Sequence, residues 1–477
     1  MTELYRGLDP DVAEVLTQWA ELHDRDYSLD RWLVNGRSRQ PVAVVRETDR
    51  DTRTTTMLVL KVLTSPSGSV RDIEYARHRQ AEREAPDFAR EHLSTFVRDA
   101  IPAPGGRWIT FQRIAADSFH NTEVLTVLLR RMLGLVDEVE PAGTSEISCS
   151  PETFAHACQA IVAGVLGEWA GPPFIPAHEE WNLATFVRWH IFDQPQPGGR
   201  LADWAQRYSS DTVRVDGESG PLPNPFAVAA GRLFADVAIT PLVGRSHGDL
   251  HTDNALVRVR PQVDTSDYFL IDTALYDSVG PLTRDPVHLL LYIVARSMEA
   301  ISTPSQQAAL IDLLIDPVHG PVDLVPGWMS ALVTGIDATT LAWVEHSGLE
   351  SVWREQTRLS LAACAMLFLG RTSTRDEDKP WFLRLAARAL AEFAAGRQLN
   401  VTESAVAIRP DATVSPTESS RVAQPPRDDM SQVGAETAST EPGAPADPAR
   451  YSKYSVNAAN ARGVQIGDSS SQHNDFH

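Results

Sequence analysis

The apolar periodicity of the chain stops at Arg397, and this break limits how much of the 477-residue sequence can fold around a core. Before it, apolar residues recur at spacings that suit packed helices and strands. Residues 398–450 are instead rich in Pro, Ser, Thr, Ala, Glu and Asp, without a sustained apolar period. We therefore expect a folded part over 1–397, a disordered linker over 398–450 and a separate tail over 451–477.

The folded part changes character at about residue 115, so we divide it in two. Residues 1–27 read as an acidic, mainly helical lead-in, and a charged helix is predicted over Arg71–His92. Three short β-rich runs lie around that helix, at Pro41–Glu47, Thr56–Leu63 and Arg107–Gln112. This pattern predicts an α+β fold with a small β-rich lobe over 1–115 and a larger helical lobe over 116–397.

The second part is dominated by helical spacing. A strand pair is predicted inside it at Ala255–Val259 and Tyr268–Ile271, joined by a polar turn. The predicted helices are Val124–Val136, Pro151–Trp169, Glu179–Ile191, Ala227–Phe234, Pro286–Met298, Gln306–Ile315, Val325–Val333, Val352–Leu369 and Trp381–Phe393.

The charge and the cysteines restrict the partners and the compartment. A net charge of −20 repels phosphate backbones and argues against nucleic acid as the main partner. It leaves ATP open, because Mg²⁺ and one or two placed cations overcome a diffuse field locally. The three cysteines, Cys149, Cys158 and Cys364, lack metal-ligand spacing. The N-terminus does not resemble a signal peptide, and no apolar run reaches the ~20 residues of a membrane span. These features predict a cytoplasmic protein.

A polar loop beside the predicted strand pair carries the most distinctive chemistry. It reads His-Gly-Asp-Leu-His-Thr-Asp-Asn from His247 to Asn254, and a further carboxylate, Asp272, ends the strand Tyr268–Ile271. Asp249 can accept a proton from an attacking hydroxyl. The oxygens of Asn254 and Asp272 suit Mg²⁺. One base and two metal ligands form the working set for phosphoryl transfer, which depends on positioning and charge neutralisation.

These residues carry a resemblance. His-Gly-Asp-Leu-His-x-x-Asn followed by Leu-Ile-Asp resembles the catalytic and metal-binding loops of the aminoglycoside phosphotransferase and choline-kinase-like branch of the protein kinase superfamily. The downstream Gly-Pro-x-x-x-Asp, from Gly280 to Asp285, and its following apolar helix are similar to the same branch. The resemblance implies a two-lobed kinase-like fold over about residues 30–397, with ATP and Mg²⁺ as cofactors.

The roles that the resemblance implies can be carried over residue by residue. Asp249 would be the catalytic base, and Asn254 and Asp272 would hold Mg²⁺. His247 would brace the loop, and Asp285 would stabilise it from the following helix. The phosphate acceptor, whether small molecule or protein, has no readable pattern in the sequence.

A lone lysine is the candidate for binding the ATP phosphates. The chain relies on arginine, and its only lysines are Lys61, Lys379 and Lys453. Lys61 lies in an apolar strand, where a single lysine is expected to contact a phosphate. The alternative is a lysine at a strand end that extends its ammonium group to water. We expect Glu74, on the next helix, to be its ion-pair partner, with Glu82 and Glu84 as alternatives.

The phosphate loop is expected over Val34–Gln40, where Gly36 and Ser38 would contact ATP. It has a single glycine, so a simple Asn-Gly turn is the alternative. The adenine is expected near Gln112–Ala115, the segment that could join the two lobes.

Two other functions stay open at this point. His247, Asp249 and His251 alternate, as in a metallohydrolase that binds Zn²⁺ or Mn²⁺, but that reading leaves Asn254 and Asp272 unexplained. The missing glycine-rich loop also fits a catalytically inactive kinase-fold adaptor that binds a partner or nucleotide.

The tail at 451–477 contains a short β-prone core, Val464-Gln465-Ile466-Gly467. Such a segment can stack in register, with Val and Ile interdigitating and the Gln amides forming a ladder. It resembles the amyloid signalling motifs of bacterial immune receptors and their effectors, and the receptor-interacting-protein homotypic interaction motif of necroptosis kinases. The resemblance implies an effector in bacterial immunity or programmed death, with self-assembly and a motif-bearing receptor as partners. The alternative is a solvated tail.

Overall fold

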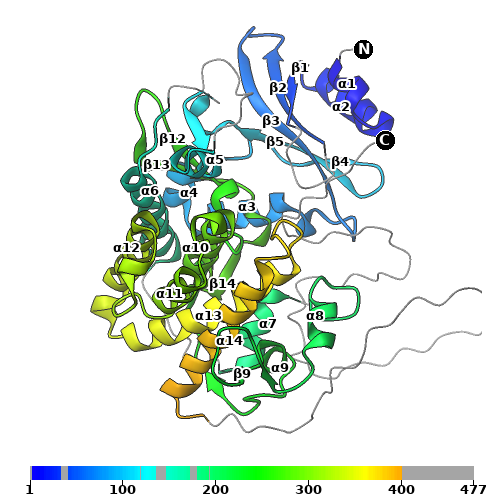
Figure 1. The fold of residues 1–477 in the computed structure, drawn as a ribbon. Helices are drawn as coiled ribbons and strands as arrows, with labels where there is room; N and C mark the ends of the chain where they lie inside the picture. The colour runs from blue at the N-terminus through cyan, green and yellow to red at the C-terminus, as the bar shows by residue number, and fades with distance from the viewer. Residues whose placement is uncertain are drawn as a thin grey trace, which may run out of the picture.

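A computed structural model describes residues 3–33, 41–118, 120–135, 147–171, 180–192 and 194–399. The chain is mixed α and β, with a five-stranded antiparallel sheet near the N-terminus and a larger, mainly helical part, which confirms that level of the prediction (Figure 1). Three sets of predicted residues lie outside the described ranges. They are the phosphate-loop residues Gly36 and Ser38, the linker 398–450 beyond residue 399, and the tail core Val464, Gln465, Ile466 and Gly467.

The five-stranded sheet has the order β1-β2-β3-β5-β4. Its strands are β1 (Arg25–Trp32), β2 (Val42–Asp49), β3 (Thr55–Thr64), β4 (Ile101–Ala103) and β5 (Arg107–Arg113). Leu58, Leu60 and Val62 of β3 are buried in the core that α1 (Glu3–Gly7) and α2 (Pro10–Leu22) cover. Because side chains alternate along a strand, Lys61 lies on the opposite face.

Two local predictions for this region were wrong. The helical lead-in does not reach residue 27, because α2 ends at Leu22 and β1 begins at Arg25. β1 is an edge strand in which Tyr27 is the only buried residue, so it lacks the alternating apolar signal of an inner strand. The predicted helix Arg71–His92 is two helices, α3 (Glu74–Glu84) and α4 (Pro86–His92), because Pro86 has no N–H to continue the first.

The helix pair α3 and α4 packs mainly on the helical part, although Tyr75 of α3 also packs with Leu63 of β3 in a small separate cluster. Ala81, Phe88 and Leu93 belong to the large core of the helical part. The Arg77 guanidinium donates to the Tyr276 carbonyl at 3.2 Å. These contacts fix α3 to the second half of the chain although its sequence lies in the first.

The helical part is built around α13, whose apolar side chains are buried between α7, α10 and α14. Its helices are α5 (Leu125–Met132), α6 (Pro151–Gly164) with a π-helical turn (Val165–Ala170), α7 (Leu183–Ile191), α8 (Ala202–Arg207), α9 (Pro225–Ala229), α10 (Arg284–Arg296), α11 (Pro304–Ile315), α12 (Gly327–Val344), α13 (Glu350–Gly370) and α14 (Lys379–Gly396). The predicted helices at 179–191 and 227–234 are therefore shorter than expected, and the one at 325–333 is longer.

Short strands in the helical part hold the polar loop. The predicted pair is present as β12 (Ala255–Arg258) and β13 (Asp264–Leu270), with β6 (Thr122–Val124) on the outer side of β12. A second pair, β11 (Val243–Ser246) and β14 (Asp277–Pro281), was not predicted. The loop thus leaves β11, passes the 3-10 turn Thr252–Asn254 and enters β12.

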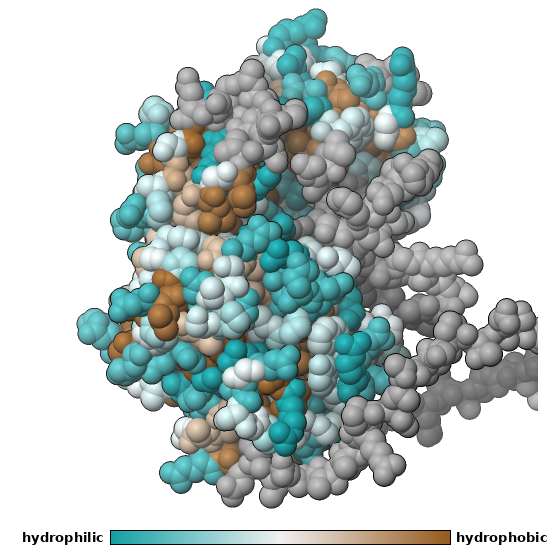
Figure 2. Space-filling model, viewed as in Figure 1, coloured by the Kyte–Doolittle hydropathy of each residue, from teal (hydrophilic) through white to brown (hydrophobic). Residues whose placement is uncertain are grey.

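Hydrophilic side chains cover most of the face shown in Figure 2, with separate apolar patches between them. Within the described ranges, every helix is too short or too polar to cross a bilayer.

Candidate active site

The loop that begins at His247 is held by a buried carboxylate on α10. Asp285 accepts a hydrogen bond from the His247 backbone N–H at 2.7 Å and another from the Gly248 N–H at 2.9 Å. Its side chain is almost fully buried, and burial raises the pKa of Asp285 even though His247 and Arg284 oppose the shift. Asp285 therefore fixes the backbone at the start of the loop.

Gly248 is required at its position by both conformation and space. Its φ is +78°, a region that disfavours residues with a side chain. A Cβ there would lie 2.2 Å from the carbonyl oxygen of Leu275. The buried Arg284 guanidinium donates from Nε to the Gly248 carbonyl at 2.6 Å and from Nη1 to the His190 carbonyl at 2.8 Å. The loop is thus pinned to α10 and to the end of α7.

His247 joins the loop to the strand end that carries Asp272. Its buried ring accepts a hydrogen bond at Nδ1 from the Asp249 N–H, at 3.3 Å, and donates from Nε2 to the Ile271 carbonyl, at 3.0 Å. This tautomer is assigned from the two partners. Both ring nitrogens form hydrogen bonds, so His247 holds the loop and the end of β13 together.

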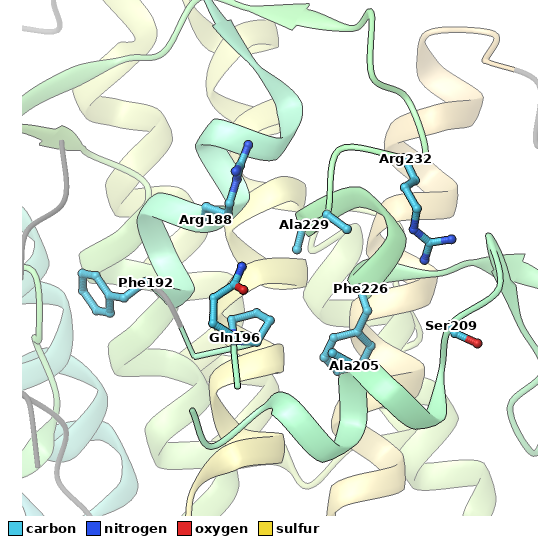
Figure 3. Close-up of a pocket in the computed structure, with 10 residues that line it drawn as sticks. Arg188, Phe192, Gln196, Ala205, Ser209, Phe226, Ala229 and Arg232 are labelled. Atoms are coloured by element: carbon cyan, nitrogen blue, oxygen red, sulfur yellow. The ribbon is translucent and has the colours of Figure 1, made fainter. Parts of the chain in front are cut away.

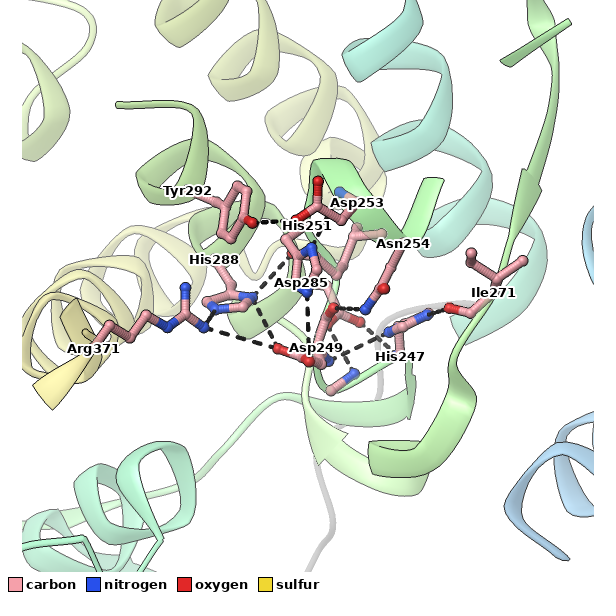
Figure 4. Close-up of polar contacts among 12 residues, drawn as sticks. His247, Asp249, His251, Asp253, Asn254, Ile271, Asp285, His288, Tyr292 and Arg371 are labelled. Atoms are coloured by element: carbon pink, nitrogen blue, oxygen red, sulfur yellow. Dashed lines mark hydrogen bonds and ion pairs between the residues drawn. The ribbon is translucent and has the colours of Figure 1, made fainter. Parts of the chain in front are cut away.

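The Asp249 carboxylate lies at the centre of a cluster of basic side chains (Figure 4). Its Oδ2 is 3.6 Å from His251 Nε2, and its Oδ1 is 3.7 Å from His288 Nδ1 and 4.0 Å from Arg371 Nη2. Burial alone would raise the pKa of Asp249, but these neighbours outweigh it and hold the pKa well below its usual range. The carboxylate is therefore ionised at neutral pH.

The permanent positive charge beside Asp249 comes from Arg371, at the end of α13, and not from His288. His288 donates from Nδ1 to the Leu250 carbonyl at 3.0 Å and accepts at Nε2 from Arg371 Nη2 at 2.7 Å. Burial and the Arg371 charge push the pKa of His288 well below its ordinary value. The ring is neutral, and Arg371 fixes its tautomer.

Sequence reasoning missed both residues. His288 lies three positions after Asp285, on the same face of α10, and that spacing was a usable signal. Arg371 comes from a distant helix end and carries no local signal in the sequence.

Asp253 and Tyr292 hold His251, one of the basic residues around Asp249, in position. The His251 ring accepts at Nδ1 from the Asp253 N–H at 3.1 Å and stacks on Tyr292 with ring centroids 4.5 Å apart. The Asp253 carboxylate accepts hydrogen bonds from the hydroxyls of Thr126 and Tyr292. Asp253 is thus used in holding the loop.

Asn254 and Asp272 stand at the adjacent ends of β12 and β13. The Asn254 amide nitrogen donates to the Asp249 carbonyl at 3.0 Å, which leaves its amide oxygen as a ligand atom. The Ile271 N–H donates to the Asn254 carbonyl at 3.0 Å, so Asp272 follows directly beside Asn254.

Asp272 lies in the field of other charges. Its backbone is left-handed, with φ 60°. Its side chain is solvent-accessible, yet the surrounding protein removes part of its hydration, and the carboxylates of Glu74 and Asp249 add negative charge. Both effects raise the pKa of Asp272, against the smaller opposing effect of Lys61. A cation at this position would relieve the excess negative charge.

The sheet contributes a buried ion pair. Lys61 Nζ lies 2.9 Å from both carboxylate oxygens of Glu74, and the side chains are 16% and 7% exposed. Burial alone would lower the pKa of Lys61, but the charges of Glu74 and Asp272 raise it overall. The alternatives pair elsewhere: Glu82 binds Arg79, and Glu84 accepts a hydrogen bond from the Tyr276 hydroxyl at 2.6 Å.

The donor atoms gathered here fit a magnesium ion. The amide oxygen of Asn254 and the carboxylate of Asp272 are hard oxygen ligands, the type that Mg²⁺ prefers.

A cavity of about 300 Å³ lies between α7, α8 and α9 (Figure 3). It is lined by Arg188, Phe192, Pro195, Gln196, Ala205, Ser209, Phe226, Ala229, Ala230 and Arg232. Phe192 ends α7 with a strained φ of 53°, and its ring centroid is 5.4 Å from the Arg284 guanidinium. Arg284 therefore touches both the cavity wall and the loop that carries Asp249.

Comparison with known proteins gives distant likenesses only. No family model matches the chain, and no curated protein matches it. Among solved structures, a glucosamine kinase in complex with glucosamine, ADP and inorganic phosphate is 11% identical, with a TM-score of 0.36 over 82% of this chain and 88% of that chain. LicA in complex with AMP is 11% identical, with a TM-score of 0.30 over 80% and 98%. Choline kinase from Cryptosporidium parvum is 8% identical, with a TM-score of 0.29 over 81% and 95%.

Proposed function

We propose that the chain is a kinase-like phosphotransferase that uses ATP and Mg²⁺. The supporting observation is that groups from both parts of the molecule share one electrostatic site. The Asp272 charge raises the pKa of Lys61, and the charges of Glu74 and Asp249 raise that of Asp272. A lysine paired with a helix carboxylate, facing a base and two oxygen ligands, is the arrangement that phosphoryl transfer uses.

Asp249 is the proposed catalytic base. The residue keeps 7% of its surface exposed, and its ionised carboxylate can accept a hydrogen bond from the hydroxyl of the phosphate acceptor. Because its pKa is held low, the carboxylate orients that hydroxyl and takes its proton late, as charge develops on the oxygen.

The remaining residues position the phosphates and the loop. Asn254 and Asp272 would hold Mg²⁺, which supplies neutralisation of the phosphate charge. Lys61 would contact the phosphates, with Glu74 fixing its ammonium group. His247 and Asp285 keep the loop in place. Gly36 and Ser38 are proposed to cover the phosphates.

The test is ATP turnover by the purified full chain with and without Mg²⁺. We expect Asp249→Asn to lower turnover by about 10²–10⁴-fold, since it removes the base with little change in volume. Asp323→Asn is the matched control, because it makes the same chemical change at an exposed site in the helical part. Equal turnover in Asp249→Asn and the parent would refute the proposal.

The inactive adaptor is the second candidate, because only one glycine is present in the expected phosphate loop. It predicts Mg²⁺-dependent ATP binding without turnover against a wide panel of acceptors. Binding and turnover are therefore measured on the same preparation.

The metallohydrolase alternative is disfavoured by geometry. Both ring nitrogens of His247 already have partners. Within the described ranges, the one group of three His, Cys, Asp or Glu side chains with metal-ligand spacing lies elsewhere in the fold. Zn²⁺ or Mn²⁺ retained at His247, Asp249 and His251, and lost on His251→Ala, would revive it.

For the tail we propose that residues 451–477 assemble as an amyloid signalling motif and recruit or activate the kinase-like part in a bacterial immunity or programmed-death pathway. The core Val464–Gly467 and the surrounding Asn and Gln residues support this proposal. The partner would be a receptor that carries a matching motif.

The tail is tested with a 451–477 peptide. We expect dye-binding fibrils that seed the full chain, and ATP turnover that rises when preformed fibrils are added. Ile466→Asp should abolish assembly, whereas Ser470→Asp, outside the core, should not. A peptide that stays monomeric even with seeds removes the amyloid proposal without affecting the active-site one.

A further inference from the structure

A histidine and two glutamates meet where α4 contacts the π-helical turn after α6. Glu91 and His92 lie at the end of α4, and Glu168 lies in the turn. One ligand atom from each residue lies within 4.8 Å of the others. None of the three belongs to the proposed active site.

The orientation of His92 points its free nitrogen at a carboxylate. The side chain is 11% exposed, and its ring stacks on Tyr268 with centroids 4.1 Å apart. Nδ1 donates to the Tyr268 carbonyl at 2.9 Å, so Nε2 of the neutral ring carries a lone pair. That lone pair faces Glu168 Oε2 at 3.7 Å, so two acceptor atoms point toward one another and a metal ion between them would bind both.

Packing holds the turn that carries Glu168 against α4. The next residue, Trp169, is fully buried and stacks on Phe88 of α4 with ring centroids 4.8 Å apart. π-helical turns are uncommon and often occur at functional positions. Glu168 therefore stands beside His92 because of a packed aromatic contact, while its own carboxylate stays exposed and adjustable.

We propose that Glu91, His92 and Glu168 bind a divalent transition-metal ion, with zinc as the best-suited ion and water completing the coordination. Bonds of about 2.0–2.2 Å place tetrahedral ligand atoms about 3.3–3.6 Å apart. The observed 3.7 Å between His92 and Glu168 is close to that value, and the exposed carboxylates can move the small remaining distance. The Tyr268 carbonyl is the outer partner that ligating histidines usually have.

The ion would fasten α4 to α6 and to β13. Tyr268 lies on β13, four residues before Asp272, so the site braces the strand that leads to the proposed metal ligand of the active site. The proposal itself does not depend on the proposed function, because metal binding is measured without turnover.

The test uses the full chain after chelator treatment, titrated with Zn²⁺ against a competing fluorescent chelator. We expect one tight equivalent, absent in His92→Ala and weakened at least about 100-fold in Glu168→Gln. Glu168 is exposed, so that variant keeps the fold. His346→Ala and Glu345→Gln, exposed residues on the same part, are the matched controls and should leave the affinity unchanged. Addition of Zn²⁺ should also raise the unfolding temperature of the parent but not of Glu168→Gln.

The proposal is overturned if the parent takes up no Zn²⁺, which would mean that the three side chains meet without binding a metal. It is equally overturned if Glu168→Gln binds Zn²⁺ as tightly as the parent, since the ion then resides elsewhere.

Discussion

His190, at the end of α7, makes the stability of the helical part sensitive to acid. It is fully buried, with Nδ1 donating to the Phe186 carbonyl at 2.9 Å and Nε2 lying 2.9 Å from the Ser360 hydroxyl. Burial, and then the nearby Arg284 charge, lower the pKa of His190 to about 3. The folded chain thus keeps this ring neutral where the unfolded chain protonates it.

The size of the effect follows from proton linkage. The unfolded state has a histidine pKa of about 6.5, so it binds one more proton than the folded state between about pH 6.5 and pH 3. The stability contribution is complete above pH 6.5 and falls as the pH drops toward 3. Between pH 8 and pH 5 the loss from this residue is about 1.5 pH units at 1.36 kcal/mol each, or roughly 2 kcal/mol.

The assay is urea unfolding at pH 8 and pH 5, followed by tryptophan fluorescence. We expect His190→Gln to be less stable than the parent at pH 8, but to lose about 2 kcal/mol less between the two pH values. His346→Gln, an exposed replacement, should leave the pH dependence of the parent intact. Identical losses in His190→Gln and the parent would refute the reasoning.

Three further substitutions test the site. Lys61→Met should lower the free energy of unfolding by about 3–5 kcal/mol, because it leaves the buried Glu74 carboxylate unpaired. The double variant with Glu74→Leu should recover most of this stability, and purely additive losses in urea unfolding would contradict the prediction. Gly248→Ala should abolish ATP turnover because its Cβ meets a backbone carbonyl, whereas Gly396→Ala, with open space around it, should be silent in the same assay. Asp285→Asn accepts only one of the two loop N–H bonds, so turnover should fall about tenfold or more with the circular dichroism spectrum preserved; unchanged turnover would show that the loop does not need both.

The sequence was most informative where the site is local. Asp249, Asn254 and Asp272 lie on one loop and one hairpin, so their spacing along the chain determines their spacing in space. Lys61 and Glu74 lie on a strand and the helix that follows it, and the structure joins them at 2.9 Å.

The sequence was least informative where distant segments meet. Arg371 reaches Asp249 from a helix end more than a hundred residues away, and only packing around α13 brings it there. The contact between His92 and Glu168 depends likewise on the stacking of Trp169 against α4. The edge strand β1 was missed for a different reason: it buries little, and an exposed strand leaves no apolar pattern to read.

The attachment of α3 to the helical part has a mechanical consequence. Arg77 and His78 of α3 bind residues that follow Asp272, with His78 Nδ1 lying 3.1 Å from the Thr273 hydroxyl, while Lys61 sits on the sheet. The Lys61–Glu74 pair therefore connects the sheet to a helix that is anchored on the helical part. A displacement of only ~1–2 Å between the sheet and this helix would take the pair beyond hydrogen-bonding range. Any change in the position of the sheet relative to the helical part would therefore strain or break this ion pair.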